Sequence, residues 1–273
     1  MRNDGGVWRW NVDPVWHHHS SMIQEAVLST EAVDDFTKYH HLRGCFYFGI
    51  GALEAFLNKQ MRSKLMQDGL PEEKIFKKLR QTTFKTKREC WPSAICEKEV
   101  QFPNEYSDII SSFNALRGEI THPKAKDHGI YKDLDEVNPK NLVESISCSI
   151  VYVYQELTCS FPYWLLGWNY VGMNGDIAYP SLSNNLNGFI WSLAHMGFGV
   201  PTGDDRAVQW EKENMTSVSG YNILRDKLDA YPEEMEPFRI VCGPTPRLTK
   251  RWWDRKYILE RTPEKYRNRV RYG

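Results

Sequence analysis

Arg117 and His122 are the two residues whose types and spacing best fit a chemical role. A guanidinium keeps its charge and can bind two phosphate oxygens at once. An imidazole titrates near neutral pH and can move a proton. With the 2′-hydroxyl of RNA as the nucleophile, His122 would act as general base or acid, and Arg117 would stabilise the charge that develops at the phosphorus. The pair therefore predicts cleavage of RNA with no metal and no other cofactor.

The same pair also has a purely structural explanation. Basic side chains near the end of a helix interact favourably with the negative end of its dipole, and on spacing alone this is the commoner reason for such a pair. A step of five residues on an ideal helix separates two side chains by about 140°, so Arg117 and His122 would not share one face. Pro123 ends the helix, and this break would let His122 turn back toward Arg117.

Helices are the elements that must position this pair. Apolar residues at steps of three and four are typical of helices with one buried face, and they give a mainly α fold class with a small helical bundle. We expect these helices over residues 21–36, 38–67, 71–80 and 104–122, with a last one that carries the apolar stripe from Leu142 to Leu157.

Two connecting segments and three glycines complete this picture of the bundle. Residues 81–103 are expected to form a loop-rich basic insertion, and residues 123–137 a polar loop. Gly44, Gly49 and Gly51 lie inside the second expected helix. A glycine costs about 1 kcal/mol there relative to alanine, so we expect close packing against a neighbouring helix at these positions.

The chain divides into three expected parts. Residues 1–20 form an N-terminal arm, residues 21–160 form the helical bundle, and residues 161–273 form an aromatic-rich C-terminal extension of mixed or irregular structure. Within the extension, the pattern favours helix weakly at 183–196 and 219–230. A single short run at 238–242 is compatible with a strand.

The arm contains three consecutive histidines, at 17–19, which are potential metal ligands. No carboxylate or thiol follows them at the spacing of a metal site. We therefore expect a solvated run before a helix and no metal site.

Charge is balanced over the whole chain but not along it. There are 35 basic and 35 acidic residues, so the net charge indicates no particular partner. Residues 74–88 carry seven basic side chains and no acidic one, and residues 247–273 carry ten basic and three acidic ones. Such local charge favours a polyanion, and aromatic rings between the charges can stack on bases. The candidates for RNA contact are Lys77, Lys78, Arg80, Lys85, Lys87, Arg88, Arg251, Trp252 and Arg255. The alternatives are a solvated face for the first segment and a docked structural segment for the second.

The remaining patterns favour a protein of the cytoplasm. The six cysteines are scattered and form no C-x-x-C pair, the chain opens without an apolar leader, and no stretch of 18 apolar residues occurs. We therefore expect a soluble cytoplasmic protein with reduced thiols and no membrane contact. The glycine-rich, serine and zinc motifs of common enzyme classes are missing from the sequence.

Two segments resemble the HEPN superfamily. Residues 113–123, Phe-Asn-Ala-Leu-Arg-Gly-Glu-Ile-Thr-His-Pro, are similar to its Arg-x4-His motif. Residues 48–58, Phe-Gly-Ile-Gly-Ala-Leu-Glu-Ala-Phe-Leu-Asn, resemble its second helix, in which Ala-Leu-Glu-x-Phe is frequent. The order of long helix, insertion, motif helix, polar loop and closing helix also agrees. The resemblance covers about residues 21–160.

The resemblance implies a HEPN-like bundle of four to five helices that forms a homodimer. In catalytic members the two motifs meet across the dimer interface and form one endoribonuclease site, which leaves a 2′,3′-cyclic phosphate and a 5′-hydroxyl. Such proteins commonly act as toxins with an antitoxin partner, in phage defence or in CRISPR-linked systems. Arg117 and His122 match the motif, and Glu54 matches an acid of the second helix that would orient one of them. A charge on the helix surface is the alternative role of Glu54.

This chain departs from the family pattern at two positions. Gly118 stands where active members often carry Asn, Asp or His, and Ala125 stands where toxins paired with nucleotidyltransferase antitoxins often carry Tyr. Two further hypotheses therefore remain open beside the nuclease. One is a non-catalytic HEPN module that binds RNA or a partner protein. The other is a structural helical module of a larger assembly.

Overall fold

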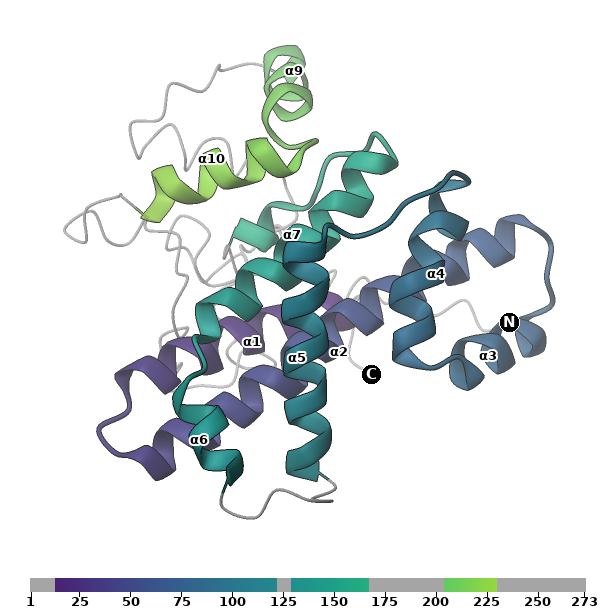
Figure 1. Cartoon of the computed structure of the whole chain (residues 1–273). Coiled ribbons are helices and arrows are strands. Elements are labelled where there is room, and N and C mark those ends of the chain that lie inside the picture. The colour runs from purple at the N-terminus through teal and green to yellow at the C-terminus, as the bar shows by residue number, and fades with distance from the viewer. Residues whose placement is uncertain (1–12, 122–128, 167–203, 230–273) are drawn as a thin grey trace, which may run out of the picture.

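The computed structural model describes residues 13–121, 129–166 and 204–229, and these residues are mainly helical with no strand among them (Figure 1). This confirms the mainly α fold class. The elements in chain order are α1 Pro14–Glu31, α2 Asp35–Gln67, α3 Glu72–Gln81, α4 Phe84–Cys96, α5 Asn104–Thr121, α6 Gly129–Asp135, α7 Pro139–Glu156, the 3-10 turn η1 Tyr163–Leu166, α9 Asp204–Asn214 and α10 Val218–Asp229.

The long helix α2 is the centre of the bundle. Asp34 caps its start, since the carboxylate accepts hydrogen bonds from the Thr37 amide at 2.9 Å and the Thr37 hydroxyl at 2.7 Å. It ends at Gln67, and Gly69 follows with φ +76°, a left-handed conformation that glycine adopts without strain. The expected apolar stripe is buried, with Phe46, Ile50, Leu53, Leu57 and Met61 each at most 2 % exposed.

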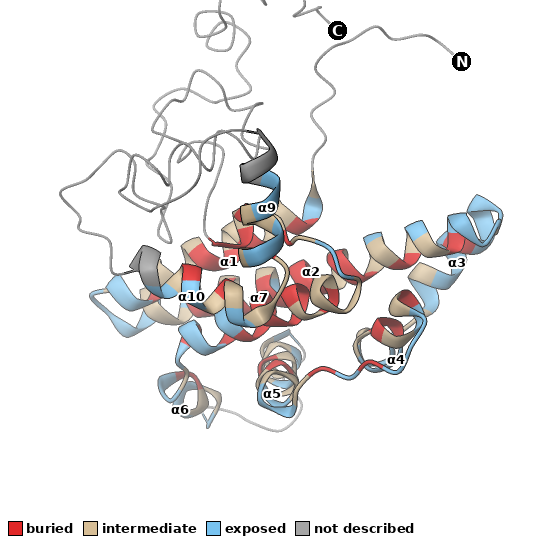
Figure 2. Ribbon diagram, turned by 90° about the horizontal axis from the view of Figure 1, so that it is seen from above, coloured by how far each residue is buried: buried red, intermediate tan, exposed pale blue. Residues whose placement is uncertain are grey.

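The other helices pack around α2. α1 lies alongside it as the other arm of a hairpin, and α5 and α7 pack against it and against each other. Figure 2 looks nearly down the axis of α5 while α2 runs across the view, so α5 crosses α2 steeply. The same view shows α3 and α6 at opposite ends of α2.

The glycines inside α2 allow α1 and α7 to approach closely, as expected. A Cβ at Gly49 would lie 2.9 Å from Met22 Sδ of α1 and 3.1 Å from the side chain of Leu142 in α7. A Cβ at Gly44 would lie 2.8 Å from the Glu25 carboxylate. The cost of glycine in the helix is thus offset by close packing of three helices.

Three segments that were expected to be irregular contain helices, so these predictions are wrong there. Helix α1 begins at Pro14 inside the expected arm, where the Asp13 carboxylate caps the amide of Val15 at 3.0 Å. Residues 84–96 of the expected basic loop form α4, which buries Trp91 and Ile95 against the core. Pro92 and the many charges obscured the helical pattern there. The shorter helix α6 likewise lies inside the expected polar loop.

The C-terminal extension does not have a core of its own in its described part. The amide of Phe161 donates to the carbonyl of Met215 at 2.8 Å, and the Tyr221 hydroxyl donates to the carbonyl of Leu165 at 3.2 Å. These side chains are buried in the same cluster as α2 and α7. Helix α10 confirms the expectation at 219–230, while 183–196 and 238–242 lie outside the described residues.

The histidine run is not the solvated segment that the sequence favoured. His19 is fully buried, and its Nε2 lies 2.9 Å from the Ser147 hydroxyl. That hydroxyl itself donates to the Val143 carbonyl at 2.7 Å, so it accepts from His19 Nε2–H. The other ring nitrogen, Nδ1, is buried with no hydrogen-bond partner. His19 is therefore a neutral core residue that ties α1 to α7.

We expect this buried histidine to make folding stability depend on pH. Burial, and secondly the positive charge of Arg225, lower the pKa of His19 from 6.5 to about 3. Below pH 6.5 the unfolded chain binds a proton at His19, whereas the folded chain binds it only near pH 3. The contribution of neutral His19 to the free energy of unfolding is therefore fully present above pH 6.5 and is lost as the pH falls from 6.5 to 3. At about 1.4 kcal/mol per pH unit, the loss from pH 7 to pH 5 is about 2 kcal/mol.

Urea unfolding of the wild type and of His19→Gln at pH 7 and pH 5 measures this loss. Glutamine retains a donor for Ser147 but does not titrate. The wild type should lose about 2 kcal/mol more than the variant over this interval. Equal losses in the two proteins would mean that His19 is not held neutral by the fold.

Candidate functional site

Arg117 lies four residues before the end of α5, and contacts with α2 fix its place. The Phe113 ring of α5 packs on the Phe46 ring of α2, with centroids 5.0 Å apart in an edge-to-face arrangement. One turn further along α5, the Arg117 guanidinium lies 5.9 Å from the centroid of the Tyr47 ring. The buried face of α5 therefore fixes this helix against α2. This packing places the half-buried Arg117 at the edge of the contact between the two helices.

Tyr47 and Thr121 hold the end of α5 beside Arg117. The Thr121 hydroxyl lies within hydrogen-bonding distance of the carbonyl of Arg117, at 2.8 Å, and of the Tyr47 hydroxyl. The Tyr47 ring is 44 % exposed, so it forms part of the surface next to the guanidinium. Arg117, Tyr47 and Thr121 together are called the helix-end cluster below.

His122 and Pro123 directly follow Thr121 but lie outside the described residues. The structure thus places the arginine of the expected pair and the helix end that leads into the histidine. Gly118, on the turn between them, is exposed, and a Cβ added there would meet nothing within 4 Å. Among the described residues, nothing therefore covers the backbone at Gly118.

Arg117 has no acidic partner within the described part of the chain. In contrast, Arg62 pairs with Glu72 at 2.7 Å, Lys59 pairs with Asp13 at 2.7 Å, and Lys38 pairs with Asp135 at 3.3 Å. Among the described residues, the Arg117 guanidinium makes a cation–π contact with the Tyr47 ring. Its planar, permanently charged group is suited to binding phosphate oxygens.

Glu54 is not joined to Arg117. Its carboxylate accepts a hydrogen bond from Lys87 of α4 at 2.6 Å, and that lysine side chain is only 4 % exposed. The Lys87 ammonium also lies 5.3 Å from the centroid of the Trp91 ring. The ion pair between Glu54 and Lys87 therefore holds α4 against α2. No hydrogen bond or ion pair connects Glu54 with the helix-end cluster among the residues that the structure describes.

Two of the residues expected to contact RNA are internal. Lys87 is buried against Glu54, and Arg88 donates to the Ser107 carbonyl at 3.2 Å and to the Ser111 hydroxyl at 2.5 Å. Both predictions are wrong, because these cations stabilise the packing of α4 on α2 and α5. Charge in the sequence does not distinguish a lysine on the surface from one that closes a buried ion pair.

The other basic candidates on α3 and at the start of α4 are exposed. These are Lys77, Lys78, Arg80 and Lys85. Figure 1 shows that α3 lies far from the end of α5 that carries Arg117, which sits beside α6. A molecule that touched both would have to run along the bundle past α4. Arg251, Trp252 and Arg255 lie outside the described residues.

Tyr47 and Thr121 are the site residues that sequence reasoning missed. Tyr47 directly follows the buried Phe46, so its position at the edge of the apolar stripe of α2 was a signal that could have been used. Its pairing with a residue 74 positions away was not visible, because helical periodicity gives the face of a helix and not its neighbour.

Residues 13–121, 129–166 and 204–229 contain no group of three His, Cys, Asp or Glu side chains arranged to hold a metal ion. No helix in these ranges combines the length and the apolar character needed to cross a membrane. Comparison of the chain with models of protein families, with curated proteins and with solved structures gave no match.

Proposed function

We propose that this chain is a metal-independent endoribonuclease of the HEPN type, which cleaves single-stranded RNA as a homodimer. The observation that supports this most directly is the helix-end cluster. A half-buried guanidinium without an acidic partner in the described structure lies near the end of α5, five residues before His122 in the sequence. The mainly helical fold and the Arg-x4-His spacing are compatible with the same family.

The proposed reaction needs one proton acceptor, one proton donor and one anion-binding group. An imidazole of His122 takes the proton of the 2′-hydroxyl, whose oxygen then forms a bond to phosphorus. The bond from phosphorus to the 5′-oxygen breaks, and that oxygen receives a proton from a second, protonated imidazole. Arg117 binds the non-bridging oxygens, whose charge grows in the transition state. The products are a 2′,3′-cyclic phosphate and a 5′-hydroxyl.

A second copy of the chain would supply the second imidazole. Gly118, one residue after Arg117, is exposed among the described residues, which is compatible with such a partner or with the substrate backbone on this side of α5. A mass measurement in solution at micromolar concentration tests the dimer, and a clean monomer would contradict a shared site. The family resemblance further favours a toxin or defence effector that a partner protein restrains.

The test of this function is cleavage of single-stranded RNA in excess EDTA. The wild type should cut, leave a cyclic phosphate, and fail on a strand with a 2′-deoxy nucleotide at the cleavage position, because that strand lacks the nucleophile. His122→Ala should leave the RNA intact, whereas Lys212→Ala at an exposed position of α9 should keep its cleavage rate within a few-fold.

Other results of this cleavage assay would contradict the mechanism or favour a different function. Cleavage that stops in EDTA, or that persists on the 2′-deoxy strand, would contradict the mechanism. RNA binding without cleavage across several substrates would instead support the non-catalytic module.

A further inference from the structure

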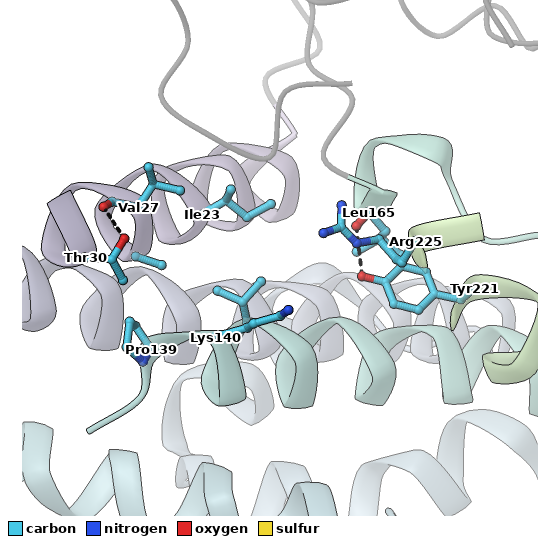
Figure 3. Close-up of a pocket in the computed structure, with 10 residues that line it drawn as sticks. Ile23, Val27, Thr30, Pro139, Lys140, Leu165, Tyr221 and Arg225 are labelled. Carbon is cyan, nitrogen blue, oxygen red and sulfur yellow. Dashed lines mark hydrogen bonds between the residues drawn. The ribbon is translucent and has the colours of Figure 1, made fainter. Parts of the chain in front are cut away.

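A pocket of about 270 Å³ lies between α1, α7, η1 and α10, and the helix-end cluster does not line it. Its apolar wall includes Ile23 and Val27 of α1 together with Pro139 and Val143 of α7 (Figure 3). Two polar groups in the wall bond to protein carbonyls: the Thr30 hydroxyl to that of Val27 at 2.8 Å, and the Tyr221 hydroxyl to that of Leu165 at 3.2 Å. The wall therefore behaves as an apolar surface.

Both charged residues among the described residues that line the pocket are cationic. Lys140 and Arg225 line it, and none of the ten lining residues is acidic. Figure 3 shows the Lys140 ammonium extending along α7 toward the end of the pocket at which the Arg225 guanidinium lies. Arg225 donates to the Leu166 carbonyl at 2.7 Å, which fixes its charge at that end. One end of the pocket is thus cationic while the rest is apolar.

The size of the pocket limits its ligand. A water molecule occupies about 30 Å³ in the liquid, so the pocket has room for roughly nine groups of that size. This is just below the range of about 300 to 1,000 Å³ that is typical of sites for drug-sized molecules. A nucleic acid or a folded partner does not fit, but a short chain with one polar head does.

We propose that this pocket binds a medium-chain aliphatic carboxylate. The carboxylate lies between Lys140 and Arg225, and the alkyl chain lies against Ile23, Val27 and Val143. Charge-assisted hydrogen bonds hold the head, and the apolar wall removes the chain from water. Because α10 and η1 form one side of the pocket and α1 and α7 the other, the ligand would join the C-terminal helix to the bundle.

Isothermal titration of the full chain with octanoate tests this proposal. Octanoate should bind, and octan-1-ol, which has the same chain without the charge, should bind at least tenfold more weakly. Lys140→Gln should weaken octanoate binding about tenfold and leave octan-1-ol binding unchanged. Lys77→Gln on helix α3, at the opposite end of α2 from α6, is the matched control and should bind octanoate like the wild type.

Val27→Phe tests the apolar part of the site. Val27 is partly exposed, so a larger ring at this position should fill the pocket and abolish binding while the unfolding temperature without ligand stays close to that of the wild type. If the wild type does not bind octanoate, or if Lys140→Gln binds it as tightly as the wild type does, the proposal is wrong. Equal binding of octanoate and octan-1-ol would also exclude the carboxylate role of the two cations.

Discussion

Replacement of Arg117 by alanine is expected to lower the rate of RNA cleavage by roughly 100- to 1,000-fold, the effect of removing one group that stabilises transition-state charge. Its described contact is a cation–π contact with the partly exposed Tyr47 ring. Such a contact is worth about 0.5 to 1 kcal/mol at an exposed site. The free energy of unfolding should therefore change by no more than about 1 kcal/mol. Initial cleavage rates at low substrate concentration, together with urea unfolding, measure both effects.

One further variant separates charge from geometry at position 117, and a second variant, at another arginine, serves as a control. Arg117→Lys keeps the positive charge but loses the planar fork that binds two oxygens, so it should restore only a small part of the rate. Arg62→Ala removes a partly exposed arginine that pairs with Glu72 of α3 and should change the rate by a few-fold at most. If Arg117→Ala unfolds more readily but cleaves at the wild-type rate when folded, Arg117 is structural and the proposed site is wrong.

The helices that could be predicted from the sequence are those whose buried face is apolar along its whole length. In α2, α5 and α7, apolar residues recur every three or four positions along the helix. The observed bounds of these helices differ from the expected ones by a few residues. Each of these helices packs on the other two. A regular apolar stripe is sufficient evidence here because these helices bury no charged residue, only apolar residues and, in α7, three serines.

Helix α4 could not be predicted in the same way, since part of what it buries is charged. Lys87 occupies a core-facing position, where its ammonium pairs with Glu54 of α2, 33 residues earlier in the chain. Arg88 satisfies a carbonyl and a hydroxyl of α5. A pattern that counts both residues as polar places them in solvent. The partners that make their burial possible are set by tertiary packing.

The candidate site shows the same division between local and long-range information. The position of Arg117 at the edge of the buried stripe of α5, near the helix end, was visible in the sequence because Pro123 marks that end. Its contact with Tyr47 depends on the crossing of α5 over α2, which no spacing along the chain encodes. Glu54 was assigned from the family pattern alone, and its pairing with Lys87 of α4 was not visible in that pattern.

Replacement of Glu54 by alanine is expected to destabilise the fold by about 3 kcal/mol, because it leaves the Lys87 ammonium buried without its acceptor. Lys87→Met should cost about 1 kcal/mol or less, since it removes the buried charge and leaves a carboxylate that is 34 % exposed and can be hydrated. The double variant Glu54→Ala/Lys87→Met should be nearly as stable as Lys87→Met alone, which corresponds to a large coupling between the two positions. Urea unfolding of the four proteins measures this cycle.

Glu72→Ala is the matched control for this cycle. The ion pair of Glu72 with Arg62 has a similar distance, 2.7 Å, but its side chains are 63 % and 42 % exposed, so its loss should cost less than about 1 kcal/mol. Equal costs for Glu54→Ala and Glu72→Ala would contradict the structural role of the buried pair.

The Glu54 and Lys87 variants also decide whether Glu54 assists cleavage. If Lys87→Met and the double variant cleave RNA at equal rates when folded, Glu54 acts only through α4, whereas a further loss of at least tenfold in the double variant would return it to the catalytic site.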